Sequence, residues 1–237
     1  MLLMERGRYR AVIADTPQDL CAAQALRARC FGLAGGVDAD PMDAASTHVL
    51  IRTTTTGAVV GCFRMLEVHG AQIGQSYAGA LYDLTALTAF EGPMLELGRF
   101  CIDPDCPDPD VLRLAWATLT AQVDARQVRL LFGCTSFQGT DPVAHGDALT
   151  WLGAHHAAPA HWAPRIKARD HFALAGCGTA EAGARGQLPP LLQTYLMMGA
   201  WVSDHGVIDR HMNTLHVFTG LEIDAIPAAR KRLLRAL

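Results

Sequence analysis

Hydrophobic and polar positions alternate between strand-like and helix-like spacing along the chain, which predicts an α/β protein. Residues 8–14 are predicted to form a short strand. Residues 17–31 carry apolar side chains near helical spacing, and Asp15-Thr16-Pro17 supplies an N-cap candidate and a first-turn proline, so a helix is expected there. Residues 32–46 lack periodicity and are predicted to be a long loop, a kind of segment that often has a functional role.

The middle of the chain is predicted to add three strands and a long helix. Residues 47–54 and 58–66 are β-branched runs separated by a Thr-Gly turn, which indicates a hairpin. Residues 67–93 are glycine-rich and irregular, and the apolar run at 94–102 is the next predicted strand. A helix is expected to open at Asp108-Pro109, with one apolar face formed by Val111, Leu112, Ala115, Leu119 and Val123.

The remaining elements continue the same alternation. Residues 128–137 form a nearly continuous apolar run, typical of a strand buried on both faces. Helices are expected at about 142–156 and 189–201, and strands near 207–208 and 216–223. Because neither a repeat nor a low-complexity linker interrupts the pattern, residues 1–237 are predicted to form a single α/β domain with a central mixed sheet flanked by helices.

Composition narrows the class of protein. Half of the 237 residues are hydrophobic and 18% are charged, which supports a sizeable core and excludes intrinsic disorder. The net charge of −3 disfavours a nucleic-acid binder that relies on neutralising phosphates. Seven cysteines without a C-x-x-C pair indicate a reducing compartment, in which they serve as small apolar residues.

The chain lacks the patterns of secreted and membrane proteins. Glu5 and Arg6 interrupt its start before an apolar signal-peptide segment could form. The longest strongly apolar stretch, residues 188–202, falls short of the roughly 20 residues that a bilayer span needs. A cytoplasmic protein is therefore expected.

Residues with candidate chemistry gather in the first predicted helix, the loop after it, the hairpin and the strand at 94–102. They are Arg27, Phe31, Asp40, Asp43, His48, Arg64, Glu96 and Arg99. In a regular strand Glu96 and Arg99 point to opposite faces, but a bulge beside Gly98 would direct both to one site. By residue type alone, an ion-pair network that stiffens the loop explains the same set and stays an alternative.

These residues resemble a known signature. Arg27, Phe31, Asp40-x-x-Asp43, Arg64 in GCFRML and Glu96-x-x-Arg99 in ELGRFCI resemble the N-terminal motifs of acyl-homoserine-lactone synthases and of bacterial ornithine Nα-acyltransferases, which make ornithine lipids. The second half separates the two families, because residues 132–142, 188–202 and 206–218 resemble the ornithine acyltransferases. The resemblance covers about residues 8–223 and implies a GNAT-like N-acyltransferase fold, with 224–237 as a basic C-terminal tail.

The resemblance also implies a reaction. A (3-hydroxy)acyl group passes from the phosphopantetheine thioester of acyl carrier protein to the α-amine of L-ornithine, giving lyso-ornithine lipid without a bound cofactor. The alternative enzyme is a lactone-type signal synthase. The alternative from another class is a relative that binds acyl chains or the carrier protein without catalysis. A lipid product would also suit peripheral contact of the basic tail with the cytoplasmic face of the membrane.

The sequence supports a carrier-protein donor independently. Acetyl-CoA-using members of this fold hold the pyrophosphate in a Gly-rich turn after the central strand, through backbone N–H groups and a helix N-terminus. Here that turn, residues 103–110, contains three prolines, which lack an N–H, and four aspartates, which repel an anion. Coenzyme A is therefore disfavoured.

The amine must lose a proton before it attacks the thioester. At pH 7 this costs roughly 1.4–2.7 kcal/mol for an α-amine but about 4.6 kcal/mol for a Lys-like amine, so the α-amine is the easier nucleophile. Glu96 is the predicted general base, paired with Arg99 in the catalytic set. Asp40 and Asp43 are candidates to hold the distal ammonium, and Arg64 or Arg99 the carboxylate. Alternatively, Arg99 pairs with an acidic residue and only orients the site.

The remaining candidates have lesser roles. Thr135 and Ser136 are predicted to line the acyl tunnel. No metal is expected, because His155-His156 and His161 lack the i, i+4 spacing of helical zinc ligands. The acidic carrier protein is expected to dock on a basic cluster, for which the candidates are Arg6, Arg8 and Arg10 with Arg29; Arg165, Lys167 and Arg169; and Arg230, Lys231 and Arg232.

Overall fold

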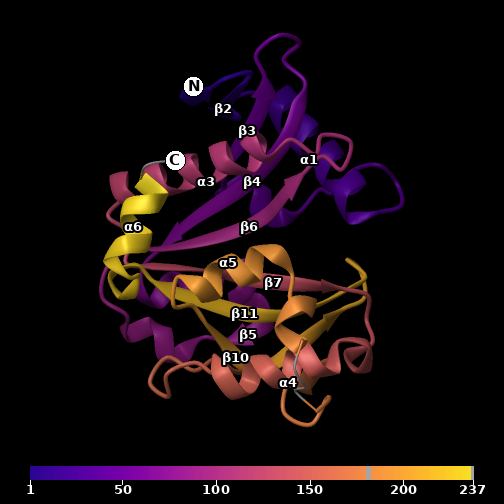
Figure 1. Ribbon diagram of the computed structural model, residues 1–237, viewed down its shortest axis with the longest axis vertical. Helices are drawn as coiled ribbons and strands as arrows, with labels where there is room; N and C mark the ends of the chain where they lie inside the picture. Colours follow the sequence, from indigo (N-terminus) through magenta and orange to yellow (C-terminus); the bar gives the residue numbers. More distant parts are fainter. Residues whose placement is uncertain (180–182, 236–237) are drawn as a thin grey trace. The chain divides into compact units, whose positions relative to one another are not determined.

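Strands and helices alternate through most of the chain, as the sequence predicts (Figure 1). The computed structural model describes residues 1–179 and 183–235, so the last two residues of the predicted tail lie outside the described part. The described residues divide into two units. Unit 1 comprises residues 1–67, 95–128 and 228–235, and unit 2 comprises residues 68–94, 129–179 and 183–227. That residues 1–237 act as a single domain stays a prediction.

Unit 1 is built on strands in the spatial order β1-β2-β3-β4-β6, and each neighbouring pair from β1 to β4 is antiparallel. Helix α1 packs on β3, and helix α3 packs on β1, β2, β3 and α6. The bounds are β1 Leu2–Arg6, β2 Tyr9–Ile13, α1 Pro17–Phe31, β3 Thr47–Thr53, β4 Val59–Val68, β6 Met94–Ile102, α3 Pro109–Ala125 and α6 Ala228–Arg235.

Unit 2 contains an antiparallel sheet in the order β7-β11-β10-β9 and a two-stranded sheet of β5 and β8. Helix α2 contacts β7 and α4 contacts β10. The bounds are α2 Tyr77–Leu81, β5 Tyr82–Asp83, β7 Leu130–Gln138, α4 Gly146–His155, β8 Arg165–Ile166, β9 His171–Ala173, α5 Pro190–Met197, β10 Trp201–Asp209 and β11 Thr214–Glu222. The α/β class with a mixed sheet and flanking helices is confirmed.

The elements that position the candidate site match the predictions closely. Helix α1 has the predicted bounds, and its N-cap is Thr16, whose hydroxyl accepts the Asp19 N–H. Gly32, in the left-handed conformation, ends the helix. The hairpin forms between β3 and β4 with His48 opposite Arg64, and β6 has the predicted bounds.

Several predicted boundaries are wrong. Strand β1 was not predicted, and the loop at 32–46 contains a short 3-10 helix at Pro41–Ala45. The irregular segment at 67–93 contains α2 and two 3-10 helices. The helix predicted at 189–201 ends at Met197, because Gly199 takes a positive φ and Trp201 begins β10.

Two burial predictions also need correction. Strand β7 is buried at its start, but the side chains of Ser136 and Gln138 are exposed, so only its first half is covered on both faces. On α3, Leu112 is 40% exposed, whereas Leu114 is fully buried. Each residue of an α-helix is rotated by about 100° from the one before it. Leu112 therefore points away from the buried Val111, whereas Leu114, three residues after Val111, lies near the same face. Among the described residues, every helix is too short or too polar to cross a membrane.

This difference on α3 gives a stability prediction. Leu114→Ala should lower the free energy of unfolding by about 2–5 kcal/mol, because it leaves a cavity in the core. Leu112→Ala, the matched control with the same change in helix propensity, should cost less than about 1 kcal/mol. Urea denaturation of both variants measures the difference. Equal losses would contradict the observed orientation of α3.

Candidate active site

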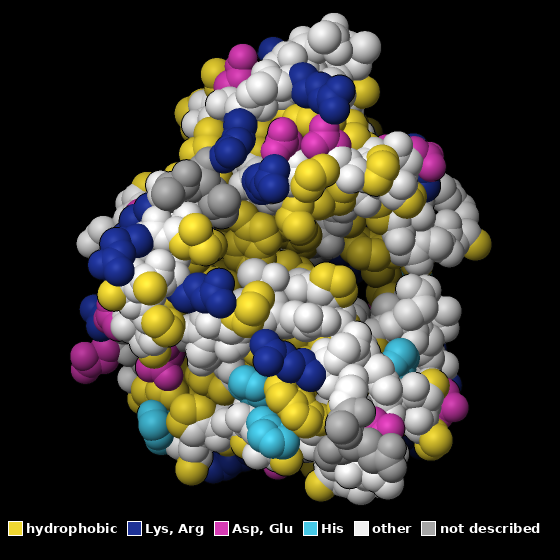
Figure 2. All heavy atoms as spheres, viewed as in Figure 1, with side chains coloured by type: hydrophobic (Ala, Val, Ile, Leu, Met, Phe, Trp, Pro, Cys, Tyr) yellow, Lys and Arg dark blue, Asp and Glu magenta, His cyan; other side chains and the backbone are white. Residues whose placement is uncertain are grey.

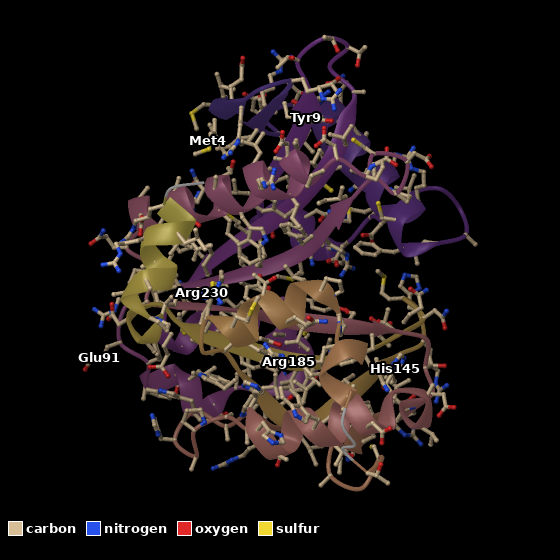
Figure 3. The ribbon with its side chains drawn as sticks, viewed as in Figure 1. Met4, Tyr9, Glu91, His145, Arg185 and Arg230 are labelled. Carbon is tan, nitrogen blue, oxygen red and sulfur yellow. The ribbon has the colours of Figure 1, made fainter. Side chains whose placement is uncertain are left out.

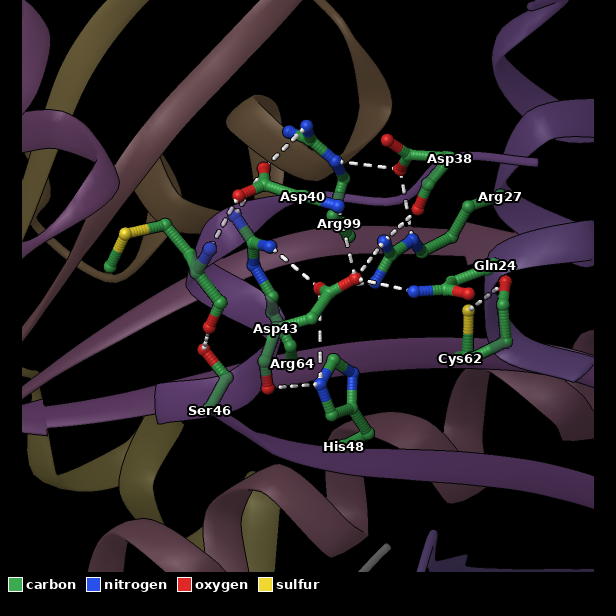
Figure 4. Close-up of polar contacts among 12 residues, drawn as sticks. Gln24, Arg27, Asp38, Asp40, Asp43, Ser46, His48, Cys62, Arg64 and Arg99 are labelled. Atoms are coloured by element: carbon green, nitrogen blue, oxygen red, sulfur yellow. Dashed lines mark hydrogen bonds and ion pairs between the residues drawn. The ribbon is translucent and has the colours of Figure 1, made fainter. Parts of the chain in front are cut away.

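Three arginines and three aspartates form a buried ion-pair network within unit 1 (Figure 4). The arginines come from α1, β4 and β6, and the aspartates come from the loop that follows α1. The members are Arg27, Arg64 and Arg99 with Asp38, Asp40 and Asp43. Their formal charges balance, which suits a network taken out of water.

Asp43 lies at the centre of the network. Its Oδ1 accepts from Arg27 Nη1 at 2.9 Å and from Arg64 Nη1 at 2.8 Å, and its Oδ2 accepts from Arg27 Nη2 at 2.8 Å and from Gln24 Nε2 at 3.0 Å. A fifth bond, from the Asp40 N–H, closes a capping box in the 3-10 helix. Burial alone would raise the pKa of Asp43, but the bonds from Arg27 and Gln24 hold it well below its usual range.

Asp38 and Asp40 link the network to β6. Asp38 Oδ2 accepts from Arg27 Nε at 2.9 Å and from Arg99 Nε at 2.8 Å, so one oxygen joins α1 to β6. Asp40 Oδ2 accepts from Arg64 Nη2 at 3.0 Å and from Arg99 Nη2 at 2.9 Å. Burial opposes ionisation of Asp40, but the Met42 N–H and Arg64 lower its pKa.

Strand β6 departs from regular geometry where a bulge was expected. Arg99 has a φ of +53°, a conformation that costs a non-glycine residue on the order of 1–3 kcal/mol. A Cβ on Gly98 would lie 3.2 Å from Arg64 Nε, so Gly98 faces the Arg64 side chain. Arg99 and Arg64 also bond to the same oxygen of Asp40. The neighbouring residues Gly98 and Arg99 of β6 therefore both lie close to Arg64 and its ion pairs. Arg99 pairs with Asp38 and Asp40, and its contact with the carboxylate of a substrate stays a prediction.

Exposure distinguishes two ends of the network. The side chains of Arg27 and Asp43 are 1% and 5% exposed, whereas those of Asp40 and Arg99 are 9% and 11% exposed. The deep end therefore holds the loop in place, and the pair Asp40–Arg99 is the more accessible end. The ion-pair alternative explains the deep end directly.

The remaining predicted site residues are Glu96, Phe31, Thr135 and Ser136. Glu96 is a buried residue of β6, 5% exposed, and its role as a base stays a prediction. Phe31 packs on an apolar cluster that includes Leu26 and Leu50. Thr135 and Ser136 belong to β7 in unit 2, where the Thr135 hydroxyl bonds to Thr219 at 2.9 Å and Ser136 is exposed. Their place along an acyl tunnel also stays a prediction.

Three contributors were not assigned roles from the sequence. Asp38 is one of several aspartates in an aperiodic loop, and only its spacing in Asp38-x-Asp40-x-x-Asp43 hints at a shared function. Gln24 lies one helical turn before Arg27, which places it on the same face of α1. His48 is buried and its Nε2 lies 3.0 Å from the Asp43 carbonyl oxygen; burial lowers its pKa, which favours a neutral ring that donates this bond.

The turn between β6 and α3 uses most of its backbone N–H groups within unit 1. Residues 104, 107 and 109 are prolines without an N–H. The N–H groups of Asp103, Asp105, Cys106, Asp110 and Val111 all donate to acceptors within unit 1. The Asp108 carboxylate accepts from Arg8 at 2.7 Å and from the hydroxyl of Tyr9 at 2.9 Å (Tyr9 is labelled in Figure 3), and Asp103 pairs with Arg29. Few donors remain for an anion.

Comparison with known proteins agrees with this architecture. Residues 24–117 match the family model of the acetyltransferase (GNAT) domain. The structure of GphF, a GNAT-like decarboxylase in complex with isobutyryl-CoA, aligns over 90% of this chain and 98% of its own with a TM-score of 0.50 at 19% identity. The chain therefore has a GNAT-like fold.

Sequence relatives narrow this class. An L-ornithine N(alpha)-acyltransferase of Rhodobacter capsulatus is 32% identical over 236 residues, which cover 92% of this chain and 91% of that protein. An acyl-homoserine-lactone synthase of Agrobacterium fabrum is 31% identical, but over only 41% of this chain and 51% of that protein. The chain belongs to the L-ornithine Nα-acyltransferase family, and it is an acyltransferase. The resemblance inferred from the motifs is confirmed.

The network yields a prediction about stability. Asp43→Asn should lower the free energy of unfolding by about 3–5 kcal/mol, because it leaves Arg27 and Arg64 buried without their shared carboxylate. The matched control is Asp110→Asn, which removes an exposed pair with Arg113 and should change stability little. Guanidinium denaturation compares the two variants. A similar small effect of both would show that the network does not hold the fold.

The pH dependence of the free energy of unfolding, measured for the wild type and Asp43→Asn, distinguishes the contribution of the Asp43 charge from that of packing. Because the pKa values of Asp40 and Asp43 are lowered on folding, their contribution is full above the unfolded value of about 3.9 and is lost as the pH falls below it. The wild-type free energy of unfolding should therefore decline as the pH falls below about 4, and Asp43→Asn should decline less. An identical decline in both would remove Asp43 as a source of this dependence.

Proposed function

We propose that this protein transfers a (3-hydroxy)acyl group from the thioester of acyl carrier protein to the α-amine of L-ornithine, giving lyso-ornithine lipid at the cytoplasmic face of the membrane. The observation that carries the proposal is the match, over nearly the whole of both chains, to a relative named L-ornithine N(alpha)-acyltransferase. A homoserine-lactone product is less favoured, since the synthase relative matches under half of the chain.

Glu96 is proposed as the general base. Its carboxylate accepts a proton from the ornithine α-ammonium, directly or through a water molecule, and the freed amine attacks the thioester carbonyl. The tetrahedral intermediate then loses a second proton from nitrogen and expels the phosphopantetheine thiolate, which takes up that proton to leave as the thiol, and an amide remains; Glu96 returns its own proton to water. Glu96 is a buried carboxylate on the strand that also carries Arg99, which gives it a fixed position relative to the network.

The network is proposed to act mainly as a scaffold for this reaction. Asp43 is held by Arg27 and Arg64, so a substrate ammonium would have to displace arginine to reach it. The pair Asp40–Arg99 is more accessible, and contact of the network with ornithine is assigned to this end. There the carboxylate of ornithine would meet Arg99 and its distal ammonium would meet Asp40.

The turn at 103–111 supports a carrier-protein donor. Coenzyme A carries a pyrophosphate that needs several backbone N–H groups or cations. In this chain those N–H groups are absent at the prolines or donate within unit 1, and the aspartates disfavour an anion. Phosphopantetheine on a carrier protein makes no such demand, because its phosphate is esterified to the carrier.

Helix α6 is the proposed contact for the acidic carrier. Four of its eight residues are Arg or Lys, and Arg235 anchors it to α3 through Asp124 at 2.8 Å. In Figure 2, Lys and Arg side chains line the surface where Figure 1 shows α6, and Figure 3 labels Arg230 there. A basic helix of this kind attracts an acidic partner at long range.

The base assignment predicts a specific kinetic loss. Glu96→Gln should lower kcat by roughly 10²- to 10⁴-fold at pH 7, the usual contribution of a positioned acid or base, while the fold remains intact by circular dichroism. Activity should recover substantially at pH 9, where more of the α-amine is already deprotonated. Near-normal turnover of the variant at pH 7 would remove Glu96 from the mechanism.

The donor assignment predicts a preference that one assay can measure. With L-ornithine fixed, kcat/KM should be far higher for 3-hydroxyacyl carrier protein than for the matching acyl-CoA, and mass spectrometry should identify Nα-acylornithine as the product. Equal kcat/KM values for the two donors would refute the inference that the turn at 103–111 disfavours coenzyme A. A lactone product, or the absence of thiol release with either donor, would refute the proposed function itself.

A further inference from the structure

Three cysteine thiols meet in unit 1 close to the network. Cys30 lies in the last turn of α1, Cys62 lies in β4 and Cys101 lies in β6. The sulfur atoms of Cys62 and Cys101 are 3.5 Å apart, and Cys30 packs on the apolar cluster that contains both. The Cys30 thiol also donates to the carbonyl of Ile102, which follows Cys101, at 3.4 Å. These contacts bring the three sulfur atoms into one small region.

The three thiols differ in access and acidity. Cys62 and Cys101 are 3% and 7% exposed, whereas Cys30 is partly exposed. Interaction with the Cys101 thiol lowers the pKa of Cys30, and the same contact raises the pKa of Cys101. Because Cys30 is the most exposed of the three thiols and packs on the cluster that contains Cys101, an oxidant should meet Cys30 first, with Cys101 nearby as a second thiol.

We propose that Cys30 is a peroxide-reactive thiol and that Cys101 resolves it as a disulfide. The Cys30 thiolate attacks hydrogen peroxide, the O–O bond breaks, and a sulfenic acid and water form. The sulfur of Cys101 then attacks the sulfenic sulfur, the S–O bond breaks, and a second water leaves as the disulfide forms. The two thiols supply the two electrons that reduce the peroxide.

We expect the disulfide to alter the ion-pair network through the short backbone segments that connect each cysteine to an arginine of the network. Cys30 follows Arg27 by three residues and Cys101 follows Arg99 by two, and these arginines meet at Asp38 Oδ2. A disulfide requires the two sulfur atoms to lie about 2.0 Å apart, so its formation should draw α1 and β6 toward each other. We expect acyl transfer to fall several-fold on oxidation and to return with a dithiol reductant; this consequence rests on the proposed function.

The test uses the full chain and mild hydrogen peroxide. After the remaining thiols are blocked, peptide mapping by mass spectrometry should find a Cys30–Cys101 disulfide that dithiothreitol removes. Cys30→Ser should abolish it, and Cys101→Ser should trap Cys30 as a sulfenic acid that dimedone labels. The matched control is Cys177→Ser, which removes another partly exposed thiol and should leave the yield of the disulfide unchanged.

Other outcomes would overturn the proposal. A Cys62–Cys101 disulfide that forms equally well in Cys30→Ser, or oxidation confined to the exposed Cys21, would show that Cys30 is not the reactive thiol. If the Cys30–Cys101 disulfide forms but wild type and Cys30→Ser lose activity equally, the link to the network is wrong. If the disulfide forms and no acylation of ornithine is ever detected, the proposed function fails while the thiol site stands.

Discussion

A single carboxylate oxygen joins a helix and a strand of the candidate site. Asp38 Oδ2 accepts from Arg27 of α1 and from Arg99 of β6, and these residues lie far apart in the chain. Asp43 and Asp40 extend the same link to Arg64 of β4. Because Arg27, Arg64, Asp38 and Asp43 are buried, the loop at 38–43 is held only while these partners remain together. The unusual backbone of Arg99 is maintained by these bonds rather than by local preference.

This arrangement changes how the signature residues are understood. Arginines and aspartates at these spacings suggest a site that binds a zwitterionic amino acid, but in the structure they satisfy one another first. Their proposed role is therefore mainly to fix the loop and β6, the strand on which Glu96 also lies. Direct contact with substrate is proposed only for Asp40–Arg99, the more accessible pair of the network. The proposed chemistry then depends on one general base, Glu96, whose position the ion-pair network fixes, and not on several charged side chains that are free to bind substrate.

The sequence was sufficient for elements whose signals are local. Thr16 and Gly32 define the ends of α1, and Gly98 marks the irregularity in β6. It was not sufficient where long-range contacts decide. Asp38 looks like any loop aspartate until Arg99 is brought to it. On the predicted buried face of α3 only Leu112 was wrong, because it has the same hydrophobicity as Leu114, which is buried instead. Strand β1 is too short and too exposed for its pattern to stand out, and it forms only by pairing with β2.

The central claim is that Asp38 couples α1 to β6 through Arg99, and a double-mutant cycle measures this coupling directly. Free energies of unfolding are determined for the wild type, Asp38→Ala, Arg99→Ala and the double variant. The coupling through the shared oxygen predicts an interaction energy of about 1–3 kcal/mol, with the double variant less destabilised than the sum of the single ones. Strict additivity would contradict it, since the two residues would then act independently and the network would not hold the site.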